Sequence, residues 1–166
     1  MNAIDLFAGA GGFSTGAAMA GAHVLWAANH WPTAVEWHRR NHPDTAHACQ
    51  DLQQCDFGAA PAHDLLLASP ACQGHSRARG AERAHHDAQR ATAWAVVTCA
   101  EVHRPAVVLL ENVPEFARWV LFPAWCAAMR RGPAVVQRCW SAGVNRPTTG
   151  AGRRVAGAGR LHGGDR

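Results

Sequence analysis

The chain has 166 residues, of which 48% are hydrophobic, so it is long enough for one domain with a buried core. No run of about 18 apolar residues occurs and no basic segment precedes the apolar N-terminal run, which predicts neither a membrane span nor a signal peptide and favours the cytoplasm. The net charge of +4 is weak evidence for a nucleic-acid surface on the folded part, because residues 1–70 hold two arginines against six carboxylates.

Short apolar runs alternate with helical patterns along the chain. The predicted strands are Ala3–Phe7, His23–Asn29, His63–Ser69 and Pro105–Val113. The first predicted helix follows the first strand and ends at about Ala20. Three further helices are predicted over Pro32–Asn41, His86–His103 and Leu121–Arg131. This alternation implies βαβ units and therefore an α/β fold with a doubly wound parallel sheet. Ligands of such a sheet bind beyond the carboxyl ends of its strands.

Three unusual clusters follow predicted strands and therefore fall at that edge of the sheet. "AGAGG" follows the first strand, "SPACQGHS" the third and "ENVPEF" the fourth. A glycine turn between a strand and a helix lets a ligand approach the backbone and the unpaired N–H groups of the helix. Such a turn could serve a nucleotide, a dinucleotide or S-adenosylmethionine, whereas the spacing of its glycines excludes a P-loop.

Cys72 and Glu111 are the reactive side chains of these clusters. A cysteine at a strand end is more often a small buried residue than a nucleophile. Cys72 stands in a polar turn, however, and a neighbouring strand ends in Glu111, whose charge needs a partner or a ligand in an apolar setting. Helix capping or pairing with an arginine is the plain alternative for Glu111. Together with the glycine turn, the two residues favour an active site.

In this order the clusters resemble the motifs of the cytosine-C5 DNA methyltransferases. "DLFAGAGGFS" (Asp5–Ser14) is similar to the first motif of that family, "SPACQGHSRARG" to its catalytic loop and "ENVPEF" to its Glu-Asn-Val motif. "HHDAQRATAW" resembles the intervening motif through Asp87 and Arg90. The resemblance covers about Ala3–Arg131. It implies a Rossmann-like methyltransferase fold and transfer of a methyl group from S-adenosylmethionine to carbon 5 of cytosine in DNA.

The resemblance also implies a role for individual residues. Cys72 would attack C6 of the cytosine to make C5 nucleophilic, Glu111 would bind N3 and the exocyclic amine, and Asn112 would fix the loop. S-adenosylmethionine would be held by Phe7, Gly9, Gly11, Trp31, Asp51 and Pro70, with Asn29 or His30 in the place of the family's ribose-binding carboxylate. The base would be flipped out of double-stranded DNA, near Gln73, Ser76 and Arg77.

Departures from the family pattern modify these expectations. Ala71 stands where the family has a proline, which predicts a less rigid loop. An amide or imidazole in place of the ribose carboxylate predicts weaker hydrogen bonds to the cofactor. No Gln-x-Arg-x-Arg motif and no recognition domain follow Val136, which predicts a truncated or frameshifted product whose fold is incomplete at the C-terminal side.

Residues 1–140 are therefore predicted to form a partial catalytic domain, and residues 141–166, rich in glycine, arginine and alanine, a disordered tail. Two alternatives to a DNA methyltransferase remain open. The first is a non-enzymatic truncated product, or half of a split methyltransferase that needs a second chain. The second is a relative of the tRNA cytosine-C5 methyltransferases, which share these motifs. The lineage suits either a restriction–modification system or a regulatory role.

The remaining cysteines and histidines show no common zinc spacing, so no metal site is predicted. The cysteines other than Cys72 are predicted to be free thiols. Of the seven tryptophans, Trp31 is the candidate ligand contact, and the others are predicted to pack in the core or between helices.

Overall fold

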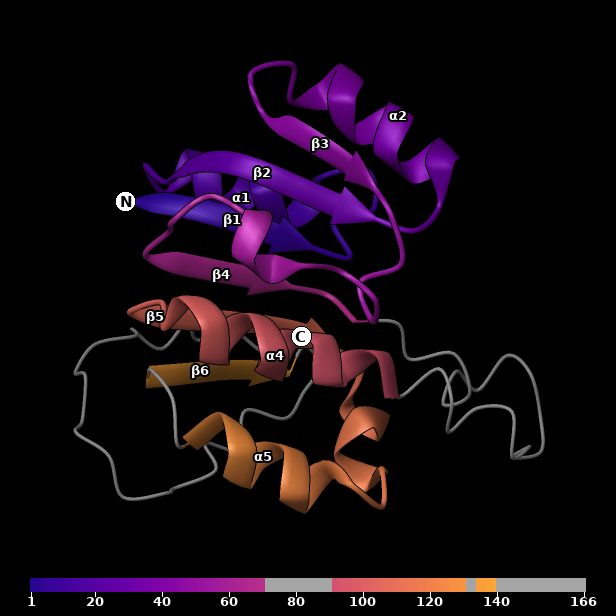
Figure 1. Cartoon of the computed structure of the whole chain (residues 1–166), viewed down its shortest axis with the longest axis vertical. Helices are drawn as coiled ribbons and strands as arrows, with labels where there is room; N and C mark the ends of the chain where they lie inside the picture. The colour runs from indigo at the N-terminus through magenta and orange to yellow at the C-terminus, as the bar shows by residue number, and fades with distance from the viewer. Residues whose placement is uncertain (71–90, 131–133, 140–166) are drawn as a thin grey trace, which may run out of the picture.

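The computed structural model describes residues 1–70, 91–130 and 134–139, which form one twisted sheet covered by helices (Figure 1). The sheet has six strands in the order β3-β2-β1-β4-β5-β6, and every neighbouring pair is parallel. The strands are β1 (Asn2–Leu6), β2 (His23–Asn29), β3 (Ala46–Cys49), β4 (Leu65–Ala68), β5 (Val107–Asn112) and β6 (Ala134–Cys139). The α-helices are α1 (Gly12–Met19), α2 (Pro32–Asn41), α4 (Trp94–His103) and α5 (Phe122–Arg130), and the 3-10 helices are η1 (Phe57–Ala59), η3 (Ala91–Ala93) and η4 (Pro114–Arg118).

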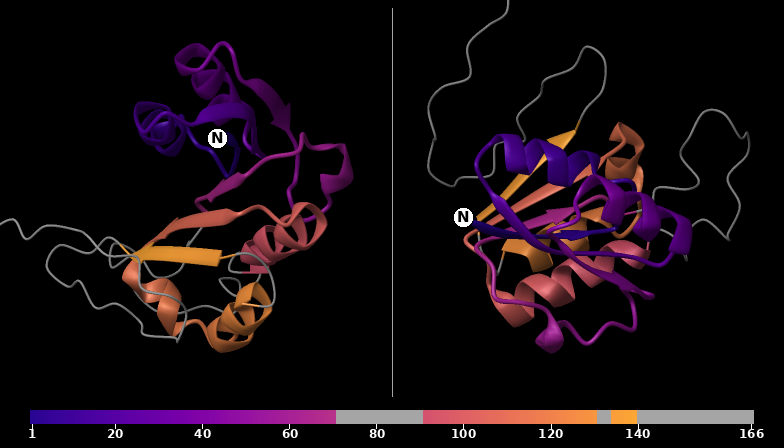
Figure 2. Two further views of the ribbon diagram at one scale, coloured as in Figure 1. Left: turned by 90° about the vertical axis from the view of Figure 1, so that its left-hand side faces the viewer. Right: turned by 90° about the horizontal axis from the view of Figure 1, so that it is seen from above.

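Helices cover both faces of the sheet, which confirms the predicted doubly wound α/β fold (Figure 2). On one face, Ala17 of α1 packs against the strands together with Val24 and Leu67. On the other face, α4 and α5 pack against Leu66, Val108 and other strand residues in the larger core. All four residues of β4 are buried, as expected for a central parallel strand with a helical layer on each side.

The observed elements agree with most of the predicted ones and add two strands. The short edge strand β3, "AHAC", has no apolar run and no clear alternation, so only its pairing with β2 defines it. The strand β6 pairs with β5 from Val107 to Asn112 and was not predicted either. Helix α1 ends just before Gly21, whose φ of +83° lies in the left-handed region that favours glycine at a helix end.

The helix predicted over His86–His103 is observed from Trp94, after the turn η3, and its first residues fall outside the described ranges. The predicted tail over 141–166 also lies outside them, so the division into a domain and a tail stays a prediction. Within the described residues, the helices are all too short or too polar to cross a membrane.

Candidate functional site

The turn between β1 and α1 has the tight backbone conformation that its glycines predict. Gly9 and Gly11 have φ values of +54° and +98°, and the N–H of Gly11 donates to the carbonyl of Ala8 at 3.0 Å. Phe7 also has a positive φ, of 60°, which is uncommon for a large side chain and is often found where a site needs an unusual backbone shape. The turn therefore directs the chain sharply away from the sheet into α1.

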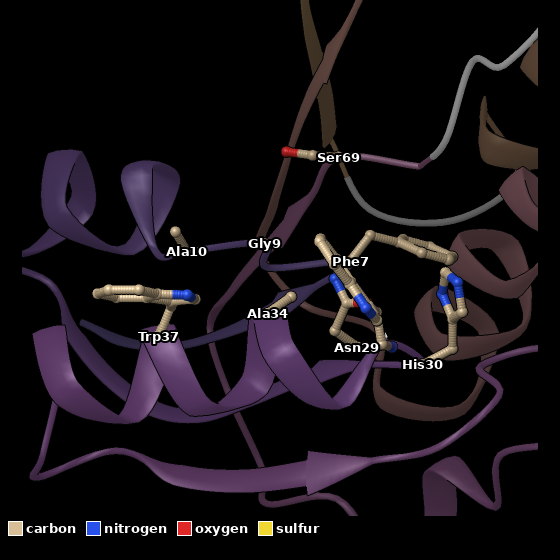
Figure 3. Close-up of a pocket in the computed structure, with 9 residues that line it drawn as sticks. Phe7, Gly9, Ala10, Asn29, His30, Ala34, Trp37 and Ser69 are labelled. Carbon is tan, nitrogen blue, oxygen red and sulfur yellow. Dashed lines mark hydrogen bonds between the residues drawn. The ribbon is translucent and has the colours of Figure 1, made fainter.

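A pocket of about 520 Å³ opens beside this turn, at the carboxyl ends of the central strands (Figure 3). One wall is the glycine turn, and the facing wall is the end of β2 with the start of α2. The lining residues are Phe7, Gly9, Ala10, Asn29, His30, Trp31, Ala34, Trp37 and Ser69. A Cβ atom on Gly9 would meet no heavy atom within 4 Å, so this glycine leaves its side of the turn open. The pocket is thus partly apolar and aromatic, with a few polar groups, as is usual for cofactor sites.

Five of the eight predicted cofactor contacts line this pocket: Phe7, Gly9, Asn29, His30 and Trp31. Gly11 does not, because it packs against the ring of His42. Asp51 is exposed in the turn after β3, where its carboxylate accepts the N–H of Gln53 at 2.9 Å. Pro70 is buried at the end of β4, outside the lining. Any contact of these three residues with a cofactor stays a prediction.

Asn29 is one of the two residues, with His30, that were predicted to replace the ribose-binding carboxylate of the family. Its Oδ1 accepts the backbone N–H of Trp31 at 3.0 Å, so this oxygen shapes the turn from β2 into α2. The Nδ2 group is then the part of the amide that could donate to a ligand hydroxyl. Trp31 is 59% exposed beside it, which leaves its ring accessible to a planar ligand.

Sequence reasoning missed four lining residues: Ala10, Ala34, Trp37 and Ser69. Trp37 was predicted to pack between helices, yet it is 53% exposed, and the guanidinium of Arg40 lies 5.2 Å from the centre of its ring. Figure 3 shows Trp37 next to Ala10, at the opposite end of the pocket from Phe7 and His30. The helical spacing of Ala34 and Trp37 places them on one face of α2, and this is the signal that could have identified both.

The catalytic residues predicted from the Glu-Asn-Val motif lie at the end of β5. Asn112 is buried, and its Nδ2 donates to the carbonyl of Pro70 at 2.9 Å. This bond joins the end of β5 to the last described residue before the predicted nucleophile. Glu111 is exposed next to it. Cys72, Gln73, Ser76 and Arg77 lie outside the described residues, as do Asp87 and Arg90 of the intervening motif, so their roles stay predictions.

A chain of buried polar groups lies beneath the glycine turn. Ser14 donates its hydroxyl to Oδ2 of Asp5 at 2.7 Å, Nε2 of His38 lies 3.1 Å from that hydroxyl, and Nδ1 of His38 lies 2.8 Å from Nε2 of His47. Burial raises the pKa of Asp5 to about 7, although Ser14 opposes the shift. Burial, helped by His42 and His47, lowers the pKa of His38 to about 4. The network therefore links β1, α1, α2 and β3 through groups whose pKa values are shifted by burial.

No group of three or more histidine, cysteine or carboxylate side chains within the described ranges could hold a metal ion. Cys49, Cys55, Cys99 and Cys126 are free thiols. Burial raises the pKa of Cys99 to about 12, so this thiol is unsuited to act as a nucleophile near neutral pH.

The parallel sheet, the glycine turn after β1 and the pocket beyond the strand ends define a Rossmann-like cofactor-binding fold. Within that class, residues 1–119 match the family model of the C-5 cytosine-specific DNA methylases. The chain belongs to this family.

Curated relatives include two type II methyltransferases. M.AgeI of Thalassovita gelatinovora is 33% identical over 121 residues, which cover 68% of this chain and 28% of the relative. M.HhaI of Haemophilus parahaemolyticus is 31% identical over 115 residues, which cover 69% of this chain and 34% of the relative. The chain thus spans about a third of the length of these relatives.

Solved structures show the same fold. A DNA modification methyltransferase encoded within an E. coli prophage superimposes with a TM-score of 0.65 at 27% identity, over 78% of this chain and 37% of that one. The Dnmt2 methyltransferase of S. pombe superimposes with a TM-score of 0.62 at 22% identity, over 79% and 40% of the two chains. The second likeness concerns the fold alone.

Proposed function

We propose that this chain is the cofactor-binding and nucleophile-bearing part of an enzyme that methylates carbon 5 of cytosine in DNA. The observation that carries the proposal is the hydrogen bond from Asn112 to the carbonyl of Pro70, because it joins two of the family's motifs at one edge of the sheet. The pocket beside the glycine turn, which belongs to the first motif, opens at the same edge, where Ser69 contributes to its lining. Methyl donor, nucleophile and base-binding carboxylate would therefore meet beyond the carboxyl ends of β1, β4 and β5.

The pocket suits S-adenosylmethionine, which would supply an electrophilic methyl group. Trp31 offers an exposed indole for stacking on the adenine, and Nδ2 of Asn29 or the ring of His30 would donate to the ribose hydroxyls. The open space beside Gly9 lets a ligand approach the backbone of the turn. Because neutral groups replace a carboxylate at the ribose, these hydrogen bonds lack the strength that charge assistance gives.

In the proposed reaction, the thiolate of Cys72 forms a bond to C6 of the cytosine, and the electron pair moves to C5. Glu111 holds N3 and the exocyclic amine, which favours the ring form that accepts the thiolate. C5 then takes the methyl group, and S-adenosylhomocysteine is the product of the donor. Loss of the C5 proton to a base and cleavage of the bond between sulfur and C6 restore the thiolate and the aromatic ring. Asn112 positions the loop through Pro70.

The proposed substrate is double-stranded DNA with the target base flipped out, because C5 and C6 are otherwise enclosed in the stack. In the split-enzyme alternative, a second chain would carry the recognition region. The relatives' names as type II methyltransferases support a role in restriction–modification. A protein in that role would act on DNA in the cytoplasm.

The test uses duplex DNA that contains 5-fluorocytosine, together with S-adenosylmethionine. Fluorine cannot leave C5 as a proton does, so the covalent adduct should accumulate and appear by mass spectrometry on the peptide that holds Cys72. Cys72→Ser should abolish the adduct, and the exposed Cys49→Ser serves as the matched control that should retain it.

Three further outcomes are informative. An adduct with a tRNA substrate and none with DNA would favour the tRNA-directed alternative. Binding of S-adenosylmethionine without any adduct, followed by adduct formation when a separate recognition chain is supplied, would identify a split enzyme. Absence of both cofactor binding and adduct in every mixture would contradict the proposed function. It would favour the alternative of a non-enzymatic product.

A further inference from the structure

The C-terminal end of α2 reaches back to the glycine turn, although 31 residues separate the two in the sequence. Nδ2 of Asn41 donates to the carbonyl of Ala10 at 2.8 Å. Nε2 of His42 lies 3.0 Å from the carbonyl of Gly11. A carbonyl can only accept, so the ring nitrogen that makes this bond must carry its hydrogen. Two neighbouring carbonyls of the turn are therefore held by two neighbouring side chains of another element.

The contact with His42 depends on Gly11 having no side chain. An added Cβ at Gly11 would lie 2.5 Å from Cδ2 and 2.6 Å from Nε2 of His42, and the φ of +98° would strain any other residue. The hydroxyl of Thr15 also donates to the carbonyl of Gly11, at 2.9 Å, and lies 3.1 Å from Nε2 of His42. Gly11, which was predicted to contact the cofactor, is thus in close contact with His42, the residue that follows α2.

The same helix also forms the facing wall of the pocket. Ala34 and Trp37 of α2 line it on one side, and Gly9 and Ala10 of the turn line it on the other. The bonds from Asn41 and His42 therefore connect the two walls, and they set the distance between them. A ligand that fills the pocket must contact both walls, so its affinity depends on this distance.

We infer that Asn41 and His42 are positioning residues. They hold the glycine turn at the distance from α2 that gives the pocket the width required by the methyl donor. This inference rests on the proposed function for the identity of the ligand. Its structural part, the restraint of the turn, is independent of any ligand. Packing of α2 onto the sheet involves other side chains, namely the buried Ala34, Val35 and His38, so loss of the two bonds should loosen the turn without detaching the helix.

The experiment compares Asn41→Ala, His42→Phe and His42→Gln with the wild-type chain. Thr33→Ala, at an exposed position of the same helix, is the matched control. Amide hydrogen exchange is measured without ligand on the peptides that cover residues 8–15 and on those of β4. Binding of S-adenosylmethionine and S-adenosylhomocysteine is measured by calorimetry on the same samples.

In Asn41→Ala and His42→Phe, we expect exchange over residues 8–15 to accelerate about tenfold, with β4 unchanged, because only the local opening becomes easier. Both ligands should bind about tenfold more weakly. His42→Gln should recover most of both losses, since its amide N–H can reach the same carbonyl. A role in general stability would instead accelerate exchange in β4 as well and would not distinguish glutamine from phenylalanine.

Unchanged exchange over residues 8–15 in both loss variants would overturn the inference, as would equal impairment by His42→Gln and His42→Phe. Faster exchange of the turn in a chain whose wild type binds neither ligand would contradict the proposed function alone. If His42→Phe fails to fold, the other two variants still test the inference. Asn41→Ala removes the bond to Ala10, and His42→Gln exchanges the donor of the bond to Gly11.

Discussion

The two faces of the sheet are covered by different kinds of side chain. Under α4 and α5 lies a large apolar core with contacting aromatic rings, among them Phe116, Trp119 and Trp125, all at most 2% exposed. Under α1 and α2 lies a smaller apolar cluster, beside the polar chain that runs from Asp5 through Ser14 and His38 to His47. The first face is mainly apolar, and its titratable groups are thiols such as Cys99 and the pair of His63 with His103 at the end of α4. The second supports the glycine turn through hydrogen bonds that involve Asp5 and His38, and its stability should therefore depend on pH.

Removal of a ring from the apolar face should have the largest effect. Trp125 is 1% exposed, and its Nε1 donates to the carbonyl of Ala93 at 2.9 Å. Trp125→Ala should reduce the free energy of unfolding by about 4–5 kcal/mol, since it leaves a cavity and an unpaired carbonyl. Urea denaturation measures the loss. Val102→Ala, at a position that is 52% exposed on α4, should cost less than about 0.5 kcal/mol. Similar losses in the two variants would contradict this account of the face.

The polar face should respond to pH through Asp5. Its pKa is about 7 in the folded chain against 3.8 as its ordinary value, so the unfolded chain releases the proton first. The stability that the protonated carboxyl contributes is complete below pH 4 and is lost as the pH rises to about 7, by about 4 kcal/mol. This loss should disappear in Asp5→Asn. The free energy of unfolding of the variant should therefore rise relative to that of the wild type as the pH increases from 4 to 7. Thermal unfolding across this range tests the slope.

His38 should produce the opposite slope on the same face. Its pKa is about 4 in the folded chain against an ordinary value of 6.5, so its contribution is complete above pH 6.5 and is lost as the pH falls towards 4. The two slopes oppose each other in the wild type, and Asp5→Asn should expose that of His38. His42 and His47 contribute to the lowered pKa of His38, and Arg39 and His42 contribute to that of His47. A flat profile in both Asp5→Asn and the wild type would contradict the coupling.

The hydrogen bond between Asn112 and Pro70 should have an intermediate effect. Asn112→Ala removes a buried hydrogen bond and leaves the carbonyl of Pro70 unpaired, which should cost about 2 kcal/mol of unfolding free energy. Adduct formation with 5-fluorocytosine DNA should fall more than cofactor affinity does, because the bond lies beside the nucleophile loop and outside the pocket lining. Equal losses of both would place Asn112 in a general structural role.

Gly9→Ala should have the smallest effect on stability and a larger one on binding. The φ of +54° costs an alanine about 1 kcal/mol, and no atom within 4 Å obstructs the new Cβ. That Cβ would occupy the open side of the turn, so calorimetry should show at least about tenfold weaker binding of S-adenosylmethionine. Gly16→Ala in the exposed middle of α1, where the φ is ordinary, should leave binding unchanged and stabilise the helix by up to about 1 kcal/mol. An unchanged affinity in Gly9→Ala would exclude this side of the turn from the site.

The parts of the fold with strong local signals were predictable. The fully apolar β4 predicts a buried strand, and the apolar run of β1 before the glycines predicts a strand that enters a tight turn. Both predictions are confirmed. The strand β3 was missed because "AHAC" carries no period of its own and becomes a strand only through pairing with Trp26–Asn29. Trp37 was assigned to helix packing because a sequence cannot show that the neighbouring wall of a helix is a pocket.

The sequence by itself determined the order of the elements other than β3 and β6, the family and the candidate residues for the chemistry, because these depend on local patterns and on motifs of fixed spacing. Only the tertiary structure decided which of those residues share a pocket. It placed Gly11 against His42, Asn112 against Pro70 and Asp5 beneath the turn with Ser14 and His38. These contacts join residues that lie 9 to 42 positions apart. Distances of that kind are set by how the sheet and its helices pack, and no periodicity in the chain records them.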